Sequence, residues 1–312
     1  MEKRNTIDMT RPLLDMRIYP DYETVQDILS IFSERYDFIS VSSLGQTILG
    51  KTIYCVNIGD VSAEKELFYV AAHHATEWMT TLILLKFINE YCEYYRSAEK
   101  VFGISINKLF NERCIHIVPL LNADGVDLHL HGDGGCILRD RLRRMSGGDY
   151  TGWQANARGV DLNHNYDAGF YEYKVLAGTK GIEAGRTRYC GEYPESEPES
   201  GAVANYLRFN EKIEALVTLH SQGELIYCSS EGKCPESIRN IGKQIEKLTG
   251  YTLSVPEGLA SYGGLTDWFI KEMNKPAFTI ECGLGENPLP LSDFHKIYSE
   301  LRRMLFLLPF MI

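Results

Sequence analysis

Apolar residues recur along this chain in two kinds of pattern, short continuous runs and helical repeats, which alternate with each other. Helical spacing is clearest over 22–35, where Val25, Ile28, Leu29 and Phe32 fall on one face. Short apolar runs have the length of buried strands. The expected strands are 66–73, 114–121, 215–221 and 277–282, and further helices are expected at about 77–95, 196–210, 235–248 and 292–307.

This alternation predicts an α/β fold, in which ligands bind where the carboxyl ends of strands meet. No internal repeat, low-complexity tract or linker divides the 312 residues, so a single domain over 1–312 is expected, with 1–18 as an N-terminal extension. Residues 126–158 are Gly-rich and charged with little periodicity, which predicts a long active-site loop. The capping-box word Ser196-Glu197-Pro198-Glu199 is expected to begin the helix at 196.

Composition narrows the function classes. Hydrophobic residues make up 44% and charged residues 24%, as in globular proteins. A net charge of −10 offers no basic excess for nucleic acid or an anionic membrane, and it leaves a peptide or small-molecule substrate as the favoured partner. No signal-peptide run and no membrane-length apolar stretch is visible, so a cytoplasmic location is expected. Eight irregularly spaced cysteines favour reduced core thiols over disulfides or a metal cluster.

Three polar residues at strand ends suggest a metal site. In the word "HATE", His74 and Glu77 are three apart, which places both side chains on one side of a helical turn. His220 closes the apolar run "ALVTLH". Each of these residues alone is more often structural, and His73 is expected to pack locally. Taken together, they make a His₂Glu zinc site with one open position the economical interpretation.

Zinc peptide chemistry also needs a base. Glu281 ends the apolar run "AFTIE" and precedes the Gly-rich turn "CGLGENP". A solvated carboxylate at the sheet edge and an active-site base are equally consistent with that context.

The words "HATE", "NADG", "GVDLNHN", "LHS" and "GGLTDW", followed by Glu281, occur in the order typical of the zinc metallocarboxypeptidase family, and the chain resembles that family from about 20 to 297. The resemblance implies a mixed, about eight-stranded twisted sheet flanked by helices, and one Zn²⁺ per chain. It assigns Glu281 as general base and acid for a zinc-activated water. It also implies the ligands His74, Glu77 and His220, with Asp161 orienting a zinc histidine.

Departures from the family pattern concern substrate binding. The Asn-Arg pair that holds a terminal carboxylate in the family is Asn163-His164 here, and a second arginine is Thr76. The family's carbonyl-polarising arginine aligns with Gln154. Arg158, four residues on, is predicted to take the oxyanion role, with a structural salt bridge as the alternative.

Further substrate contacts are expected from the second half of the chain. Ser221 follows the third zinc ligand. The family's mobile tyrosine aligns with Leu259, so Tyr262 is the nearest phenol, either as its substitute or as a packed side chain. Thr266 occupies the position that sets side-chain preference, where it lacks the acidic group that selects basic residues.

The words "NARGVDLN" and "LHSQGELIY" are similar to the branch of γ-D-glutamyl-diamino-acid peptidases, which cleave peptidoglycan stem peptides. The leading hypothesis is therefore a zinc peptidase for muropeptides. The alternatives are a carboxypeptidase for ordinary peptides that uses protonated His164, and a non-catalytic binding protein on the same fold. An arginine cluster in the loop is expected either to bind the substrate's carboxylates or to form a solvated face. Its members are Arg139, Arg141, Arg143 and Arg144.

Overall fold

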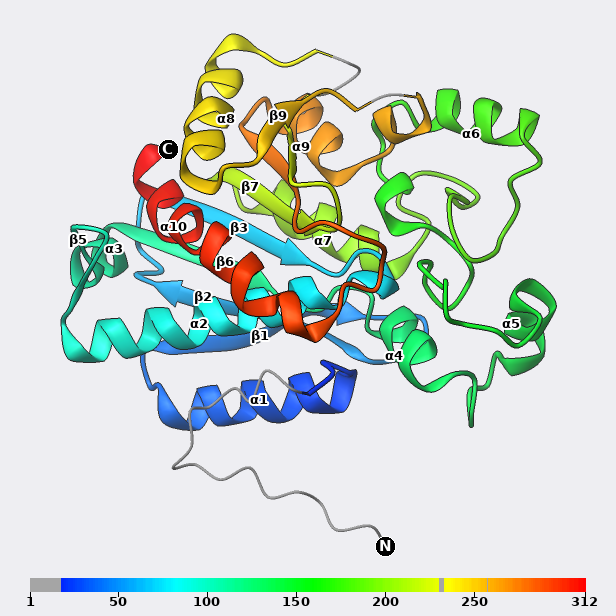
Figure 1. Cartoon of the computed structure of the whole chain (residues 1–312), viewed down its shortest axis with the longest axis horizontal. Helices are drawn as coiled ribbons and strands as arrows, with labels where there is room; N and C mark the ends of the chain where they lie inside the picture. The colour runs from blue at the N-terminus through cyan, green and yellow to red at the C-terminus, as the bar shows by residue number, and fades with distance from the viewer. Residues whose placement is uncertain (1–17, 230–232, 257) are drawn as a thin grey trace, which may run out of the picture.

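A computed structural model describes residues 18–229, 233–256 and 258–312, and Figure 1 shows the arrangement of their helices and strands. The strands are β1 (Ile39–Gln46), β2 (Thr52–Gly59), β3 (Lys65–Ala71), β4 (Lys100–Val101), β5 (Ile104–Ser105), β6 (Arg113–Val118), β7 (Ile213–His220), β8 (Leu225–Tyr227), β9 (Thr252–Ser254) and β10 (Ala277–Glu281). Eight of them form one mixed sheet in the order β1-β2-β6-β3-β7-β10-β8-β9, while β4 and β5 pair separately. The mixed, about eight-stranded sheet that the family resemblance implies is confirmed.

The centre of the sheet is parallel. β3 pairs in parallel with both β6 and β7, and β7 pairs in parallel with β10. The side chains of β3 from Glu66 to Ala71 are all buried, because helices cover both faces of a parallel sheet. The carboxyl ends of β3, β7 and β10 therefore meet at one edge of the sheet. His74, His220 and Glu281 lie at or just after these strand ends.

The helices are α1 (Tyr22–Arg35), α2 (Met79–Ser97), α3 (Ile106–Glu112), α4 (Ala123–His131), α5 (Arg139–Ser146), α6 (Phe170–Thr179), α7 (Pro198–Phe209), α8 (Glu236–Thr249), α9 (Leu265–Met273) and α10 (Phe294–Met311), with short 3₁₀ turns η1 (Ala75–Glu77), η2 (Leu162–His164), η3 (Gly258–Ser261) and η4 (Leu291–Asp293). Helices α2 and α10 lie on the face toward the viewer in Figure 1, and α7 lies behind the sheet. The Tyr69 hydroxyl joins β3 to α10 by donating to the Leu305 carbonyl over 3.1 Å.

Helix α1 has the predicted bounds. Its N-cap Asp21 accepts a hydrogen bond from the Thr24 backbone N–H over 2.9 Å, and the four apolar residues of its predicted face are buried. The strand expected at 66–73 ends earlier, at Ala71, because Ala72 adopts a positive φ of 55° that turns the chain.

The long loop predicted at 126–158 is partly wrong, because it contains most of α4 and all of α5. The Asn122 side chain accepts a hydrogen bond from the Gly125 N–H, so "NADG" caps a helix where a turn was expected. Helix α5 buries only Leu142 and Ser146, too few positions to give an apolar repeat.

The capping-box prediction at Ser196 is also wrong. The N-cap of α7 is Glu197, and Pro198 occupies the first helical turn, where its missing N–H costs nothing. Ser196 instead donates to Glu197 and accepts from Asn165, and Glu199 is fully buried.

The eight cysteines are free thiols, six of them buried, with Cys136 and Cys234 half-buried. Among the described residues, no helix has the length and apolar character needed to cross a membrane.

Candidate metal centre

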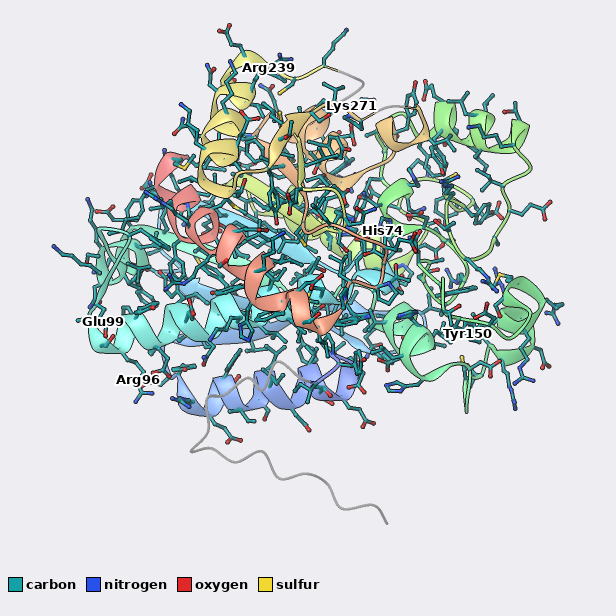
Figure 2. All side chains as sticks on the ribbon, viewed as in Figure 1. His74, Arg96, Glu99, Tyr150, Arg239 and Lys271 are labelled. Carbon is teal, nitrogen blue, oxygen red and sulfur yellow. The ribbon has the colours of Figure 1, made fainter. Side chains whose placement is uncertain are left out.

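Three parallel strands bring the predicted metal ligands together. His74 caps η1 directly after β3, and Glu77 is the last residue of that turn. His220 ends β7, and the register of the sheet places Glu281 of β10 opposite it. His74 lies at the carboxyl-terminal edge of the sheet in Figure 2. Residues separated by more than 140 positions thus meet because parallel strands end at the same edge.

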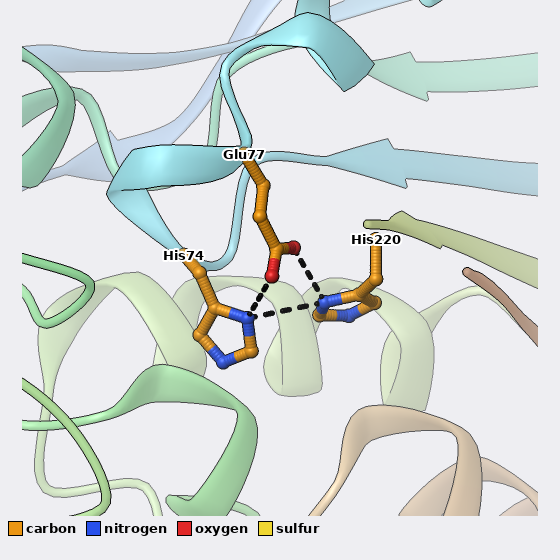
Figure 3. A group of neighbouring side chains, drawn as sticks. All are labelled: His74, Glu77 and His220. Atoms are coloured by element: carbon orange, nitrogen blue, oxygen red, sulfur yellow. Dashed lines mark hydrogen bonds and ion pairs between the residues drawn. The ribbon is translucent and has the colours of Figure 1, made fainter. Parts of the chain in front are cut away.

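The donor atoms of His74, Glu77 and His220 converge on one point (Figure 3). Glu77 Oε1 lies 2.9 Å from His74 Nδ1, and Glu77 Oε2 lies 3.0 Å from His220 Nδ1. The two Nδ1 atoms are 3.3 Å apart. Tetrahedral zinc ligands at about 2.1 Å from the ion are roughly 3.4 Å from one another, so this spacing fits Zn²⁺.

Asp161 fixes the tautomer of His74. Its Oδ1 lies 3.1 Å from His74 Nε2, which therefore carries the hydrogen and donates it. The Nδ1 lone pair of neutral His74 then faces a carboxylate oxygen, an arrangement of two acceptors that requires a cation or a proton between them. The residues present therefore fit a zinc ion.

The two glutamates of the centre have opposite electrostatics. Burial opposes ionisation of Glu77, but facing His74 and His220 outweigh it and lower the pKa of Glu77 to about 2. Burial raises the pKa of Glu281 to about 7, with His220 opposing and Glu77 adding to the rise. Glu77 is thus a permanent anion suited to ligation, whereas Glu281 can gain or lose a proton near neutral pH.

His73 packs locally, as predicted. It is fully buried, its Nε2 lies 3.1 Å from the Tyr166 hydroxyl and its Nδ1 lies 3.3 Å from the Thr218 hydroxyl. Its ring stacks on that of the predicted ligand His220, with 5.3 Å between the ring centroids.

The comparisons with known proteins identify the family. The family model for zinc carboxypeptidases matches residues 25–304. This chain belongs to the zinc carboxypeptidase family. As a family member it is a zinc metallopeptidase, and its His-Glu-His centre can hold the metal.

Relatives cover most of the chain. The uncharacterised protein YqgT of Bacillus subtilis (strain 168) is 35% identical over 286 residues, which are 91% of this chain and 75% of the relative. The gamma-D-glutamyl-L-diamino acid endopeptidase 1 of Lysinibacillus sphaericus is 31% identical over 283 residues, 90% of this chain and 69% of the relative. The structure of bovine thrombin-activatable fibrinolysis inhibitor in complex with tick carboxypeptidase inhibitor has a TM-score of 0.73 at 22% identity, covering 93% of this chain and 96% of that one. This last similarity supports the fold.

Arg158 forms a salt bridge, as the alternative to its predicted oxyanion role supposed. Its Nη1 lies 3.6 Å from Glu197 Oε2, and its backbone carbonyl accepts from Arg141 over 3.3 Å. Gln154 lies closer to the metal centre: its Oε1 accepts from the Thr187 hydroxyl, and its carbonyl accepts from the Ala75 N–H inside the ligand turn. The oxyanion role of Arg158 and the substrate contact of Gln154 stay predictions.

His164 is half-buried and bonded to other protein groups. Its ring stacks on Tyr173 at 4.1 Å, and its Nδ1 donates to the Tyr262 carbonyl over 2.8 Å. Burial lowers the pKa of His164, with Asp161 opposing the effect. Asn163 Oδ1 accepts from the Leu265 N–H over 3.2 Å. Because its pKa is lowered, His164 is mainly neutral at pH 7, which disfavours its use as a carboxylate-binding cation.

The remaining predicted substrate residues have structural partners. Ser221 donates to Asn287 Oδ1 over 2.8 Å, and its carbonyl accepts from the Asn287 amide over 2.7 Å. The Tyr262 ring lies against Gly169, which leaves no room there for a Cβ atom. Thr266 shares a 2.7 Å hydrogen bond with Thr279 of β10. Contacts of these residues with substrate stay predictions.

Sequence reasoning missed the two residues that complete the surroundings of Asp161. The backbone N–H of Arg188 donates to Asp161 Oδ2 over 2.9 Å, and the Thr187 hydroxyl approaches the same oxygen at 3.4 Å. No local pattern signals these contacts, since Arg188 and Asp161 are 27 positions apart in a segment without periodicity.

The α5 arginines largely form a charged surface. Arg143 Nε lies 2.6 Å from Asp133 Oδ2, Arg139 Nε lies 3.6 Å from Asp133 Oδ1, and Arg144 is exposed. Their pairing with Asp133 agrees with the solvated-face interpretation.

Proposed function

We propose that this protein hydrolyses amide bonds in peptidoglycan-derived peptides, at the bond between γ-linked D-glutamate and a diamino acid, with one zinc ion per chain. The similarity to an endopeptidase named for that bond, which spans 90% of this chain, carries the proposal. The neutral, internally bonded His164 supports it, because a terminal carboxylate would find no cation at that position.

The geometry suggests how the chain's own residues take part. Zinc, when bound by His74, Glu77 and His220, supplies a Lewis acid that polarises the scissile carbonyl and acidifies water. Glu281 accepts the proton of the attacking water, because its pKa of about 7 allows it to be ionised at neutral pH. Glu281 then returns that proton to the leaving amine. Asp161 keeps the His74 ring in its ligating orientation throughout.

Trimming of ordinary peptides from the C-terminus is the second candidate. Membership of the zinc carboxypeptidase family favours it. It would require His164 to be protonated, so activity would rise as the pH falls toward the lowered pKa of that histidine.

The two candidates are separated by substrate. Zinc-loaded protein is incubated with L-Ala-γ-D-Glu-meso-diaminopimelate and with a blocked dipeptide that has a free C-terminus, and products are identified by mass. Release of diaminopimelate from the tripeptide is expected. Cleavage of the dipeptide alone would reject the peptidoglycan assignment, and the Glu281→Gln variant controls for contaminating peptidases.

A further inference from the structure

Arg188 is an exposed arginine whose backbone is fixed beside the metal centre. Its N–H donates to Asp161 Oδ2 over 2.9 Å, while Asp161 Oδ1 accepts from the zinc ligand His74. Its carbonyl accepts from the Tyr173 hydroxyl over 2.5 Å. These two hydrogen bonds fix the Arg188 backbone, and Asp161 alone separates it from the predicted zinc ligand His74.

The backbone conformation of Arg188 is unusual for its residue type. Its φ is 67°, in the left-handed region that side chains with a Cβ atom rarely adopt. Glycine or asparagine would adopt this conformation at lower cost. An arginine in this conformation next to the predicted metal centre points to a use for its side chain.

The guanidinium of Arg188 has no hydrogen-bond or ion-pair partner within the part of the chain that the structure describes. The two neighbouring loop arginines differ: Arg186 pairs with Asp149 at 3.1 Å, and Arg158 pairs with Glu197 at 3.6 Å. The charge of Arg188 lies close enough to His164 to contribute to lowering the pKa of that imidazole. Within the described residues, Arg188 therefore carries a positive charge that no protein group pairs with.

The surroundings favour an anionic ligand group for this cation. When Glu281 is ionised, Glu77, Asp161 and Glu281 together carry three negative charges, one more than a bound Zn²⁺ offsets, so a further cation favours an anionic substrate. The planar guanidinium matches a carboxylate by two parallel hydrogen bonds. A γ-linked glutamate leaves its α-carboxylate free beside the scissile amide, and the diamino acid carries another.

We propose that Arg188 binds a free substrate carboxylate adjacent to the scissile bond and thereby makes the enzyme selective for acidic peptides. This inference rests on the proposed function and names its specificity residue. The bound group is a carboxylate in either case, and it belongs either to the glutamate or to the diamino acid.

Binding to a catalytically inactive protein tests the proposal. Zinc-loaded Glu281→Gln protein is titrated calorimetrically with L-Ala-γ-D-Glu-meso-diaminopimelate and with two derivatives, one amidated at the glutamate α-carboxylate and one at the diamino acid carboxylate next to the scissile bond. One amide is expected to bind roughly 10- to 100-fold more weakly than the free acid, and that amide identifies the source.

Adding Arg188→Gln should weaken binding of the free acid by a similar factor and erase its advantage over that amide. Arg188→Lys should bind the free acid more tightly than Arg188→Gln but less tightly than the arginine, because lysine keeps the positive charge and lacks the paired N–H donors of the guanidinium. Arg186→Gln, two positions away, is the matched control and should retain the preference. In the otherwise wild-type enzyme, Arg188→Gln should raise KM more than it lowers kcat.

An acid preference that survives Arg188→Gln, or equal weakening for all three peptides, would overturn the proposal. Hydrolysis of the tripeptide by wild-type protein reports the proposed function separately. Hydrolysis without any Arg188-dependent preference rejects the specificity role alone, and absence of both binding and hydrolysis rejects both. Glutamine leaves the two backbone bonds available, and an unchanged melting temperature verifies folding.

Discussion

Glu281 and His220 stand opposite each other in register at the ends of the parallel strands β10 and β7. This pairing places a titratable carboxylate beside a predicted metal ligand. Because the two residues end paired strands, the proposed base lies beside the predicted ligand before substrate binds.

Glu281→Gln should abolish hydrolysis and leave zinc binding intact. The amide cannot accept the proton of water, and loss of a positioned general base lowers kcat by about 10²- to 10⁴-fold. Peptide hydrolysis and metal content are measured on the same sample. Equal activity of the variant and wild type would contradict the role of Glu281 as base.

The activity of the wild-type protein should rise with pH as the carboxyl group of Glu281 loses its proton. Burial raises the pKa of this carboxyl to about 7, and the base works only when ionised, so activity falls below that pKa. Bound zinc favours the anion and shifts this rise toward lower pH. The measurement is kcat/KM against pH. Activity that instead increased as pH fell below 7 would favour the carboxypeptidase that uses protonated His164.

Zinc binding should release protons at neutral pH. Burial opposes the charge on His74, but Glu77 and Asp161 outweigh it and raise the pKa of His74 well above its ordinary value in the metal-free protein. A zinc ion must displace that proton, so affinity falls as pH decreases. Calorimetric titration in buffers of different ionisation enthalpy counts the protons. A count of zero would show that His74 is already neutral.

Asp161→Asn should weaken zinc binding by about 10- to 100-fold. The asparagine oxygen can serve His74 or the Arg188 N–H, but its amide group then faces another donor. Zinc affinity is determined by competition with a chelating dye. Asp149→Asn, whose carboxylate pairs with Arg186 outside the centre, should bind zinc like wild type.

Glu199→Gln should stabilise the protein at pH 8 and have little effect near pH 4.5. Burial raises the pKa of Glu199 from 4.5 to about 7, so the folded state disfavours its anion. The cost is absent below the unfolded pKa, grows as pH rises toward 7 and reaches about 3 kcal/mol above it. Melting temperatures at both pH values test this. A stabilisation independent of pH would show that the buried charge is not its cause.

The sequence alone predicted the family of this protein and the strands that carry its candidate site residues. Continuous apolar runs predicted the strands that end at His220 and Glu281, because a strand buried on both faces consists mostly of apolar residues. The spacing of His74 and Glu77 placed both side chains on one side of a turn, and only together with His220 did it predict a metal site.

Tertiary structure decided the surroundings of those ligands. The contact of Arg188 with Asp161 and the stacking of His164 on Tyr173 join residues of a segment without periodicity, so no local pattern records them. The same applies to Arg158, whose charge is paired by Glu197 after the chain has folded back. Residue type and spacing predict the candidate ligands, whereas the partners of His164, Arg158 and Arg188 depend on contacts between segments that the fold brings together.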